Sequence, residues 1–323
     1  MYSPKFIITN EILTNIGIIE AAREVIDNAA LVPAYEKKFR DEALIRTVHH
    51  GTHIEGNKLN LLQAERILAG QNVVARDRDI WEVINYRRVM EFISKLKVDS
   101  GELKIDEGMI KEVHKLTVNK ILPVETVGKY RKTQVVVKNN RTGKITFRPP
   151  PALEVSYQIE DFLVWLNNTK TEPVHPVLKS GVVHYEIARI HPFIDGNGRV
   201  ARALSTLILF IDGYDIRRFF SLEEYFDITK GLAIELSKIK EKVQKLSVDV
   251  KIKEKLGGQI ALSERQIKII EYIQRVGFLQ NQAFESLFTM VSEDTILREL
   301  KDLLKKKIIK KKGRTKGAKY ILA

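Results

Sequence analysis

The chain has 323 residues and a formal net charge of +13, so it is long enough for two or three domains with hydrophobic cores and suited to polyanionic ligands. It contains no cysteine, which excludes disulfides, thiolate metal sites and cysteine nucleophiles. The sequence has no signal-peptide pattern and no apolar run near the ~20 residues of a membrane-spanning helix, so we expect a cytoplasmic protein without membrane contact.

Residues 1–104 are predicted to form a helical region. Two stretches carry apolar residues at helical spacing, namely Ile12, Ile16, Ile19 and Ala22 in the first and Ile80, Val83, Ile84, Val89 and Phe92 in the second. Three histidines, His49, His50 and His53, also lie close together here. Their spacing matches no standard set of metal ligands, so we predict no metal site in this region.

Residues 105–245 are predicted to form a mainly helical core. Apolar spacing predicts its helices near 106–121, 153–167, 175–189 and 199–212. Helical spacing places His184 on the third of these helices, where we interpret it as a packed structural histidine. We interpret His114, on the first of them, in the same way.

A β-hairpin is predicted inside this core, over residues 128–150. Thr133 to Val137 form an alternating stretch, residues 139–143 are typical of a turn, and Lys144 to Phe147 would form the returning strand. Three consecutive prolines at 149–151 end the hairpin.

Residues 191–202 read His-Pro-Phe-Ile-Asp-Gly-Asn-Gly-Arg-Val-Ala-Arg and combine the parts that phosphate chemistry needs. The two glycines beside Asn197, Gly196 and Gly198, allow a tight turn with positive φ, so that successive backbone N–H groups can point one way. The apolar pattern that follows predicts a helix start. Such a turn before a helix N-terminus predicts an anion site.

The charged residues of the same stretch support this interpretation. Arg199 and Arg202 lie three apart in the first helical turn, where positive charge opposes the helix dipole unless a polyanion such as a triphosphate docks there. Asp195 just before the turn is a hard carboxylate of the kind that binds Mg²⁺ beside a polyphosphate. His191 can accept a proton from an attacking hydroxyl near neutral pH, and Phe193 is interpreted as a buried anchor of the loop.

Residues 246–262 are predicted to be a linker, and residues 263–323 a separate domain. Three helices are expected in this domain, beginning at a capping box at Ser263, near residue 280, and at a second cap at Ser292. A terminal hairpin follows them. Three helices and a hairpin resemble a winged helix-turn-helix domain.

The charge of this last domain leaves two kinds of partner open. Residues 263–323 carry +7 of the net charge of +13, and several basic residues of the hairpin could meet phosphates, namely Lys310, Lys311, Lys312, Arg314, Lys316 and Lys319. The third helix begins with Ser292, Glu293 and Asp294, however, and base readout uses that part of the helix. A nucleic-acid partner therefore stays open, and a protein-binding or structural role is favoured.

The stretch 191–202 resembles the signature of the Fic family, His-Pro-Phe-x-(Asp/Glu)-Gly-Asn-Gly-Arg-x-x-Arg, and agrees with it at every fixed position. The resemblance implies an all-α core that transfers AMP from ATP, with Mg²⁺, to a Ser, Thr or Tyr hydroxyl of a target protein. It implies that His191 is the general base and Asp195 the Mg²⁺ ligand. Arg199 and Arg202 would bind the triphosphate. The remaining positions would cradle the phosphates: Gly196, Asn197 and Gly198.

A second stretch, Gly51-Thr-His-Ile-Glu-Gly-Asn57, resembles the inhibitory helix motif of this family, Ser/Thr-x-x-x-Glu-Gly/Asn. The resemblance implies that Glu55 pairs with Arg202 and holds it away from the γ-phosphate of ATP. Gly51 stands where the family has Ser or Thr, and Thr52 is one residue late. The hydrogen bond that supports the glutamate in the family is therefore not predicted from this sequence.

The resemblance also gives the hairpin and the C-terminal domain a context. In the family the hairpin is a flap, here residues 128–150, that holds a target segment by strand-like pairing. Many Fic proteins carry a winged helix after the core, and many self-associate, so a homodimer is possible. Many relatives have a tyrosine pair near the adenine, but Tyr225 and Phe226 come early for that role, and the residues that contact the adenine are not assigned.

The leading prediction is a protein adenylyltransferase that is restrained by its own Glu55. Two alternatives stay open. The first is a related enzyme that transfers another nucleotidyl group, or that removes AMP with Glu55 orienting water. The second is a DNA-binding regulator that uses the C-terminal domain.

Overall fold

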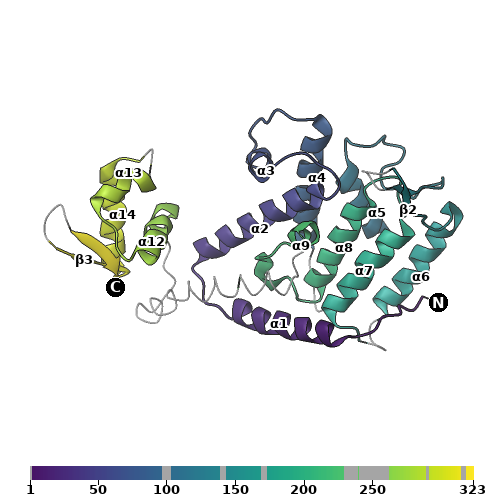
Figure 1. Cartoon of the computed structure of the whole chain (residues 1–323), viewed down its shortest axis with the longest axis horizontal. Coiled ribbons are helices and arrows are strands. Elements are labelled where there is room, and N and C mark those ends of the chain that lie inside the picture. Colours follow the sequence, from purple (N-terminus) through teal and green to yellow (C-terminus); the bar gives the residue numbers. More distant parts are fainter. Residues whose placement is uncertain are drawn as a thin grey trace. The chain divides into compact units, whose positions relative to one another are not determined.

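The computed structural model describes most of the chain, namely residues 2–96, 103–138, 143–168, 173–228, 239, 262–288, 291–313 and 318–323. Contacts divide it into two compact units (Figure 1). The first consists of Met1–Asp27 and Arg40–Lys240, and the second of Asn28–Phe39 and Glu241–Ala323. None of the helices in the described ranges combines the length and apolar character that a membrane span requires.

The N-terminal region is helical, as predicted. Its helices are α1 (Asn10–Asp27), α2 (Pro33–His53), α3 (Leu61–Leu68) and α4 (Asp77–Lys95). A capping box at Asn60 and Gln63 satisfies free backbone N–H groups at the start of α3. In α4 the predicted apolar stripe is turned inward, since Val83 and Val89 are fully buried.

The predicted core helices are confirmed as α5 (Glu107–Val118), α6 (Val155–Asn167), α7 (Pro176–Ile190) and α8 (Asn197–Ile211), with a short α9 (Leu222–Ile228) after them. Figure 1 shows α6, α7 and α8 side by side. Buried apolar residues of α2, α4 and α5 to α8 share one hydrophobic core. The core thus includes residues on both sides of position 104. The buried faces of α7 and α8 are part of it, and this packing fixes the two helices.

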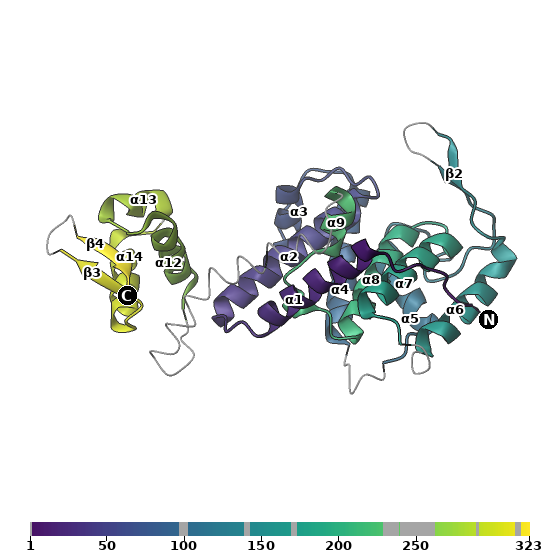
Figure 2. The ribbon, with the colours of Figure 1, turned by 60° about the horizontal axis from the view of Figure 1, so that its bottom comes forward.

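The hairpin is present but shorter than predicted. Its strands are β1 (Val137–Lys138) and β2 (Ile145–Phe147), which pair antiparallel with an irregularity in register, and it extends away from the helices of its unit (Figure 2). The predicted strand Thr133–Val137 is wrong except at Val137. The ladder ends at the pair Val137 and Phe147, and the prolines at 149–151 that follow have no N–H to donate to a longer ladder. The Gln134 side chain bonds the Pro149 carbonyl instead, at 2.9 Å. The predicted turn lies outside the described residues except for Gly143.

The second unit contains the elements predicted for the C-terminus. They are α12 (Glu264–Val276), a 3₁₀ turn (Asn281–Ala283), α13 (Phe284–Leu287), α14 (Glu293–Lys305), β3 (Ile309–Lys312) and β4 (Lys319–Leu322). The capping box at Ser263 is confirmed. Ser292 is the N-cap residue of α14, as predicted, but its hydroxyl bonds the Thr295 hydroxyl at 2.9 Å and no backbone N–H. The predicted linker 246–262, apart from Leu262, lies outside the described residues, as do Arg314 and Lys316.

Candidate active site

His191 lies directly after α7, and its surroundings hold the imidazole in the neutral form. Its backbone is left-handed, with φ 51° and ψ 58°, which turns the chain sharply out of the helix. Its Nδ1 lies 3.2 Å from the Ala188 carbonyl. Because a carbonyl only accepts, Nδ1 carries the proton and the Nε2 lone pair is left available. Burial lowers the pKa of His191 below its ordinary value, so the ring is uncharged at neutral pH.

The loop after His191 is held by a buried aromatic side chain and by hydrogen bonds from Asn197. Phe193 is fully buried and stacks on the His114 ring, with centroids 3.7 Å apart. The Asn197 side chain closes the loop, since its Oδ1 accepts from the Phe193 N–H and its Nδ2 donates to the Phe193 carbonyl, both at 2.8 Å. Gly196 has φ +83°. The predicted anchor role of Phe193 is confirmed. A phosphate contact by Asn197 stays a prediction, and because its side chain bonds Phe193, such a contact would come from its backbone N–H.

His114 joins this loop to the base of the flap. Its Nδ1 accepts from the Gly128 N–H at 3.0 Å, so Nε2 carries the proton and donates to the Asp195 carbonyl at 3.2 Å. The residue is fully buried, and burial lowers the pKa of His114 to about 4. The structural interpretation of His114 is thereby confirmed.

Asp195 is an ionised carboxylate at the entrance to α8. Burial by itself raises its pKa, but the charges of Arg199 and Arg78 outweigh burial and hold the pKa of Asp195 below its usual range. Its Oδ2 accepts from Arg78 at 2.6 Å, and its Oδ1 accepts from the Gly196 N–H at 2.6 Å. In the described ranges no group of three or more His, Asp or Glu side chains could hold a metal ion alone. A single carboxylate fits Mg²⁺ that arrives with phosphate oxygens as its other ligands.

Arg199 is buried beside Glu82 of α4. Only 1% of the residue is exposed, and its NH1 lies 3.4 Å from Glu82 Oε1. Glu82 also accepts from Asn57 Nδ2 at 2.9 Å and from Arg78 Nε at 3.1 Å. This carboxylate therefore ties the segment after Glu55 to the helix that carries the signature. Contact of Arg199 with a triphosphate stays a prediction.

Arg202 and Glu55 meet as predicted. The Arg202 NH2 group donates to Glu55 Oε1 and to the Gly51 carbonyl, both at 2.8 Å. A side chain at Gly198 would collide with the Glu55 carboxylate. Glu55 thus lies against the first turn of α8, where the helix N-terminus attracts negative charge.

The missing Ser or Thr at position 51 has a structural reason. A side chain on Gly51 would collide with the Tyr86 ring. The next residue does not replace it, because the Thr52 hydroxyl donates within its own helix, to the Val48 and His49 carbonyls, each at 3.0 Å.

The close packing of Gly51 against the Tyr86 ring can be tested by substitution. Gly51→Ala is expected to lower the free energy of unfolding by about 1–3 kcal/mol, because the methyl group overpacks against Tyr86. Gly17→Ala is the matched control, since Gly17 is also helical and a Cβ there meets nothing within 4 Å. Urea unfolding measures both, and equal effects of the two substitutions would contradict the packing argument.

Sequence reasoning missed the role of Arg131, which is 2% exposed. Its Nε donates to the His191 carbonyl at 2.8 Å and its NH2 group to the Pro150 carbonyl at 2.6 Å, while its backbone N–H donates to Pro192 at 2.9 Å. Burial lowers the pKa of Arg131. This side chain fastens both ends of the flap to the loop of His191. Its partners lie 19 and 60 residues away, so no local sequence signal could have revealed them.

Arg131→Ala is expected to lower the free energy of unfolding by roughly 2–4 kcal/mol, because it leaves several buried carbonyls without a donor. Arg148→Ala removes an exposed arginine of the same flap and serves as the control, expected within ±0.5 kcal/mol. Urea unfolding of the two variants makes the comparison. A loss at Arg131 no larger than that at Arg148 would show that these bonds do not hold the flap.

The remaining histidines lie beside the site. His50 and His53 contact Asp227 of α9 through Nδ1, at 2.7 and 2.9 Å. Burial and then the charges of His50 and His53 lower the pKa of His49 to about 4. His184 packs edge-on against Phe226, with ring centroids 4.6 Å apart.

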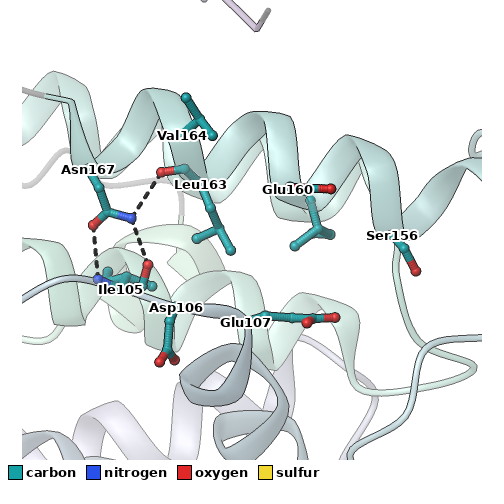
Figure 3. A pocket seen from close by; sticks show the side chains of 9 residues that line it. Ile105, Asp106, Glu107, Ser156, Glu160, Leu163, Val164 and Asn167 are labelled. Carbon is teal, nitrogen blue, oxygen red and sulfur yellow. Dashed lines mark hydrogen bonds between the residues drawn. The ribbon is translucent and has the colours of Figure 1, made fainter.

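The first unit also contains a cavity of about 540 Å³ between the start of α5 and α6 (Figure 3). Its lining includes Asp106 and Glu107, but both carboxylates already have partners. Asp106 accepts from the Met109 N–H at 2.7 Å, and Glu107 pairs with Lys111 at 2.7 Å. The lining contains none of the predicted site residues, and we assign it no function.

The segment that carries the site matches a known family. Residues 104–209 match the model of the Fic/DOC family. A segment of 183 residues, 55% of this chain, is 36% identical to "Protein adenylyltransferase fic-1" of Caenorhabditis briggsae, covering 34% of it. A similar segment is 31% identical to "Protein adenylyltransferase Fic" of Drosophila grimshawi, over 58% of this chain and 36% of that protein. The matches therefore span about a third of the length of these relatives.

Solved structures show the same fold. A Fic family protein from Desulfovibrio desulfuricans G20 superposes with a TM-score of 0.60 and 23% identity, over all of this chain and 98% of that one. Fic-1 from Caenorhabditis elegans superposes with a TM-score of 0.56 over 74% of this chain and 73% of that one. With the signature residues gathered at the start of α8, residues 104–209 of this chain are a domain of the Fic/DOC family.

Proposed function

We propose that the protein is an adenylyltransferase that transfers AMP from ATP to a Ser, Thr or Tyr hydroxyl of a target protein. The observation that carries this proposal is the neutral His191, with its free Nε2, beside the ionised Asp195 and the N-terminus of α8. The names of the relatives support the same reaction.

The chemistry follows from these positions. The target hydroxyl oxygen forms a bond to the α-phosphorus of ATP, the bond from that phosphorus to the bridging oxygen breaks, and pyrophosphate leaves. Nε2 of His191 accepts the hydroxyl proton. The backbone N–H groups at the start of α8 and the Arg202 guanidinium would bind the outer phosphates. No covalent bond to the enzyme is required.

Asp195 is the residue that would hold Mg²⁺ brought by the nucleotide. The ion would neutralise charge on the phosphate oxygens. Because Arg78 occupies Oδ2, binding at that oxygen requires Arg78 to move. Arg78 is half exposed on its side chain, so it can turn to solvent or to a phosphate.

We propose that the conformation described here is the restrained one. Glu55 engages Arg202 and fills the space above Gly198, where an outer phosphate would otherwise lie. Withdrawal of this carboxylate would free both the cation and the helix N-terminus for the nucleotide.

The flap is the proposed docking site of the target. Ile145 and Phe147 on β2 are exposed, and the sheet described there has two strands, so an extended target segment can pair along an outer edge. Arg131 and His114 connect the flap base to the loops of His191 and Asp195, which would place the paired segment close to the base.

Mass spectrometry tests the proposal. After incubation of the Glu55→Gly protein with ATP and Mg²⁺, a peptide of that protein or of a lysate protein is expected to carry AMP on a hydroxyl side chain. Peptides that gain phosphate alone, or no nucleotide, would contradict the proposal.

We further propose that residues 263–323 form a winged helix-turn-helix module with a protein partner. The first turn of α14 holds Glu293 and Asp294, which would repel the phosphates of a DNA groove. A gel shift of the full chain is expected to show only weak DNA binding that salt abolishes. Tight, sequence-selective binding would contradict this proposal.

A further inference from the structure

Asp195, the residue that would hold Mg²⁺, has two cations beside it. Its Oδ2 accepts from the Arg78 NH2 group at 2.6 Å, and its Oδ1 lies 3.7 Å from the Arg199 NH2 group. Glu82 adds a second carboxylate, 3.1 Å from Arg78 and 3.4 Å from Arg199. The formal charges of the two carboxylates and the two guanidiniums cancel. This group of four side chains therefore attracts a divalent cation little until further negative charge arrives.

The two arginines differ in how easily they can leave Asp195. The Arg199 side chain is 2% exposed, whereas the Arg78 side chain is 51% exposed. Moving Arg199 would disturb the buried packing of α8. A half-exposed guanidinium is hydrated again by water as it leaves, so breaking its ion pair costs little. Arg78 is thus the cation that an incoming ion can displace.

Arg78 also has a second anchor, which stays in place when its contact with Asp195 is broken. Its Nε donates to Glu82 Oε1, one turn further along α4, at 3.1 Å. Glu82 is 3% exposed and is held by Asn57, whose Nδ2 donates to Glu82 Oε2 at 2.9 Å and to the Asp79 carbonyl at 3.0 Å. The NH2 group can therefore leave Asp195 while Nε remains on Glu82, and the same side chain can return.

We propose that Arg78 is a displaceable counterion of Asp195, which competes with Mg²⁺ for Oδ2 and gives way when a nucleotide brings the ion together with its phosphate charge. The proposal rests on the proposed function, because it takes Asp195 as the metal ligand. It adds a restraint that is separate from Glu55. Glu55 engages the cation that would bind the outer phosphates, whereas Arg78 occupies the oxygen that would bind the metal.

Nucleotide affinities with and without metal test this competition apart from turnover. All proteins carry Glu55→Gly, to empty the phosphate site, and His191→Ala, to prevent transfer. Calorimetry gives the Kd for ATP in EDTA and in Mg²⁺. The ratio of the first Kd to the second, here called the metal ratio, reports how much the ion adds to binding. Arg78→Gln is expected to raise the metal ratio roughly three- to five-fold, the upper range for a partly exposed ion pair.

Three further variants sharpen the test. Arg76→Gln is the matched control, because Arg76 also forks onto a carboxylate, Asp79, through Nε and NH2 at 2.8 and 2.7 Å, and it is expected to leave the metal ratio unchanged. Asp195→Asn removes the contested carboxylate, so Arg78→Gln is expected to have no effect on the ratio in that background. Arg78→Lys keeps the charge but cannot span both carboxylates, and a smaller rise is expected. Thermal melting shows whether each variant folds, and Arg78→Lys carries the test if Arg78→Gln does not.

The outcomes separate this inference from the proposed function. A metal ratio that is unchanged in folded Arg78→Gln, or that rises equally in Arg76→Gln, overturns the inference and leaves Asp195 as the metal ligand. A rise of the same size in the Asp195→Asn background also overturns it, because competition requires the carboxylate. If the reference protein with Glu55→Gly and His191→Ala binds ATP equally well in EDTA and in Mg²⁺, Asp195 holds no ion, and the inference falls together with that part of the proposed function.

Discussion

Glu55→Gly is expected to raise the rate of AMP transfer roughly ten- to hundred-fold, the factor that corresponds to one hydrogen-bonded contact with a charged group. The carboxylate now occupies both the Arg202 guanidinium and the space above Gly198. Its removal leaves a buried cation and a helix N-terminus that the triphosphate can satisfy. Initial rates of label transfer from ATP, at equal protein concentrations, measure the effect.

Charge and position can be separated with matched variants. Glu55→Gln keeps the length of the side chain but removes its charge, so we expect a smaller increase than with glycine. Glu65→Gln alters an exposed carboxylate on the neighbouring helix α3 and is expected to leave the rate unchanged. Equal rates for wild type, Glu55→Gly and Glu55→Gln would contradict the inhibitory role of Glu55.

His191→Ala is expected to lower the transfer rate of the Glu55→Gly protein by about 10²- to 10⁴-fold, the usual contribution of a general base. The affinity for ATP is expected to stay within about two-fold, because His191 acts on the hydroxyl and not on the triphosphate. Single-turnover rates and calorimetry distinguish the two quantities. A loss of ATP binding equal to the loss of rate would assign His191 to nucleotide binding instead.

The pH dependence of the Glu55→Gly protein follows from the same residue. His191 must be deprotonated to accept the hydroxyl proton, so the rate falls as the pH drops through its pKa. Burial lowers the pKa of His191 from 6.5, which places this fall below pH 6.5. A profile that already falls above pH 6.5 would require a different base.

The sequence was sufficient for the parts of the molecule that local patterns determine. Helical spacing of apolar residues predicts α1, α4 and α5 to α8, and the contiguous signature 191–202 predicts the position of the site. Glu55 could be paired with Arg202 only through resemblance to a family, since 147 residues separate them. The structure confirms that contact.

The parts that the sequence could not predict depend on contacts between distant segments. The strand from Thr133 was overpredicted, because alternation in one segment does not show whether the returning segment can donate N–H groups to it, and the prolines at 149–151 cannot. Arg78 and Asp195 are 117 residues apart. In the sequence, Gly51 is only a departure from the motif. The structure explains it, because the ring of Tyr86, 35 positions later, occupies the space that a side chain at position 51 would need.

The central claim is tested most directly by incubating wild type, Glu55→Gly and Glu55→Gly/His191→Ala with ATP labelled at the α-phosphate and, separately, at the γ-phosphate. Mg²⁺ is present, and gel autoradiography detects label on protein. The account predicts label from the α-position only, stronger in Glu55→Gly than in wild type and absent in the double variant. Label from the γ-position, or no α-label on the protein or any lysate protein with Glu55→Gly, would contradict it.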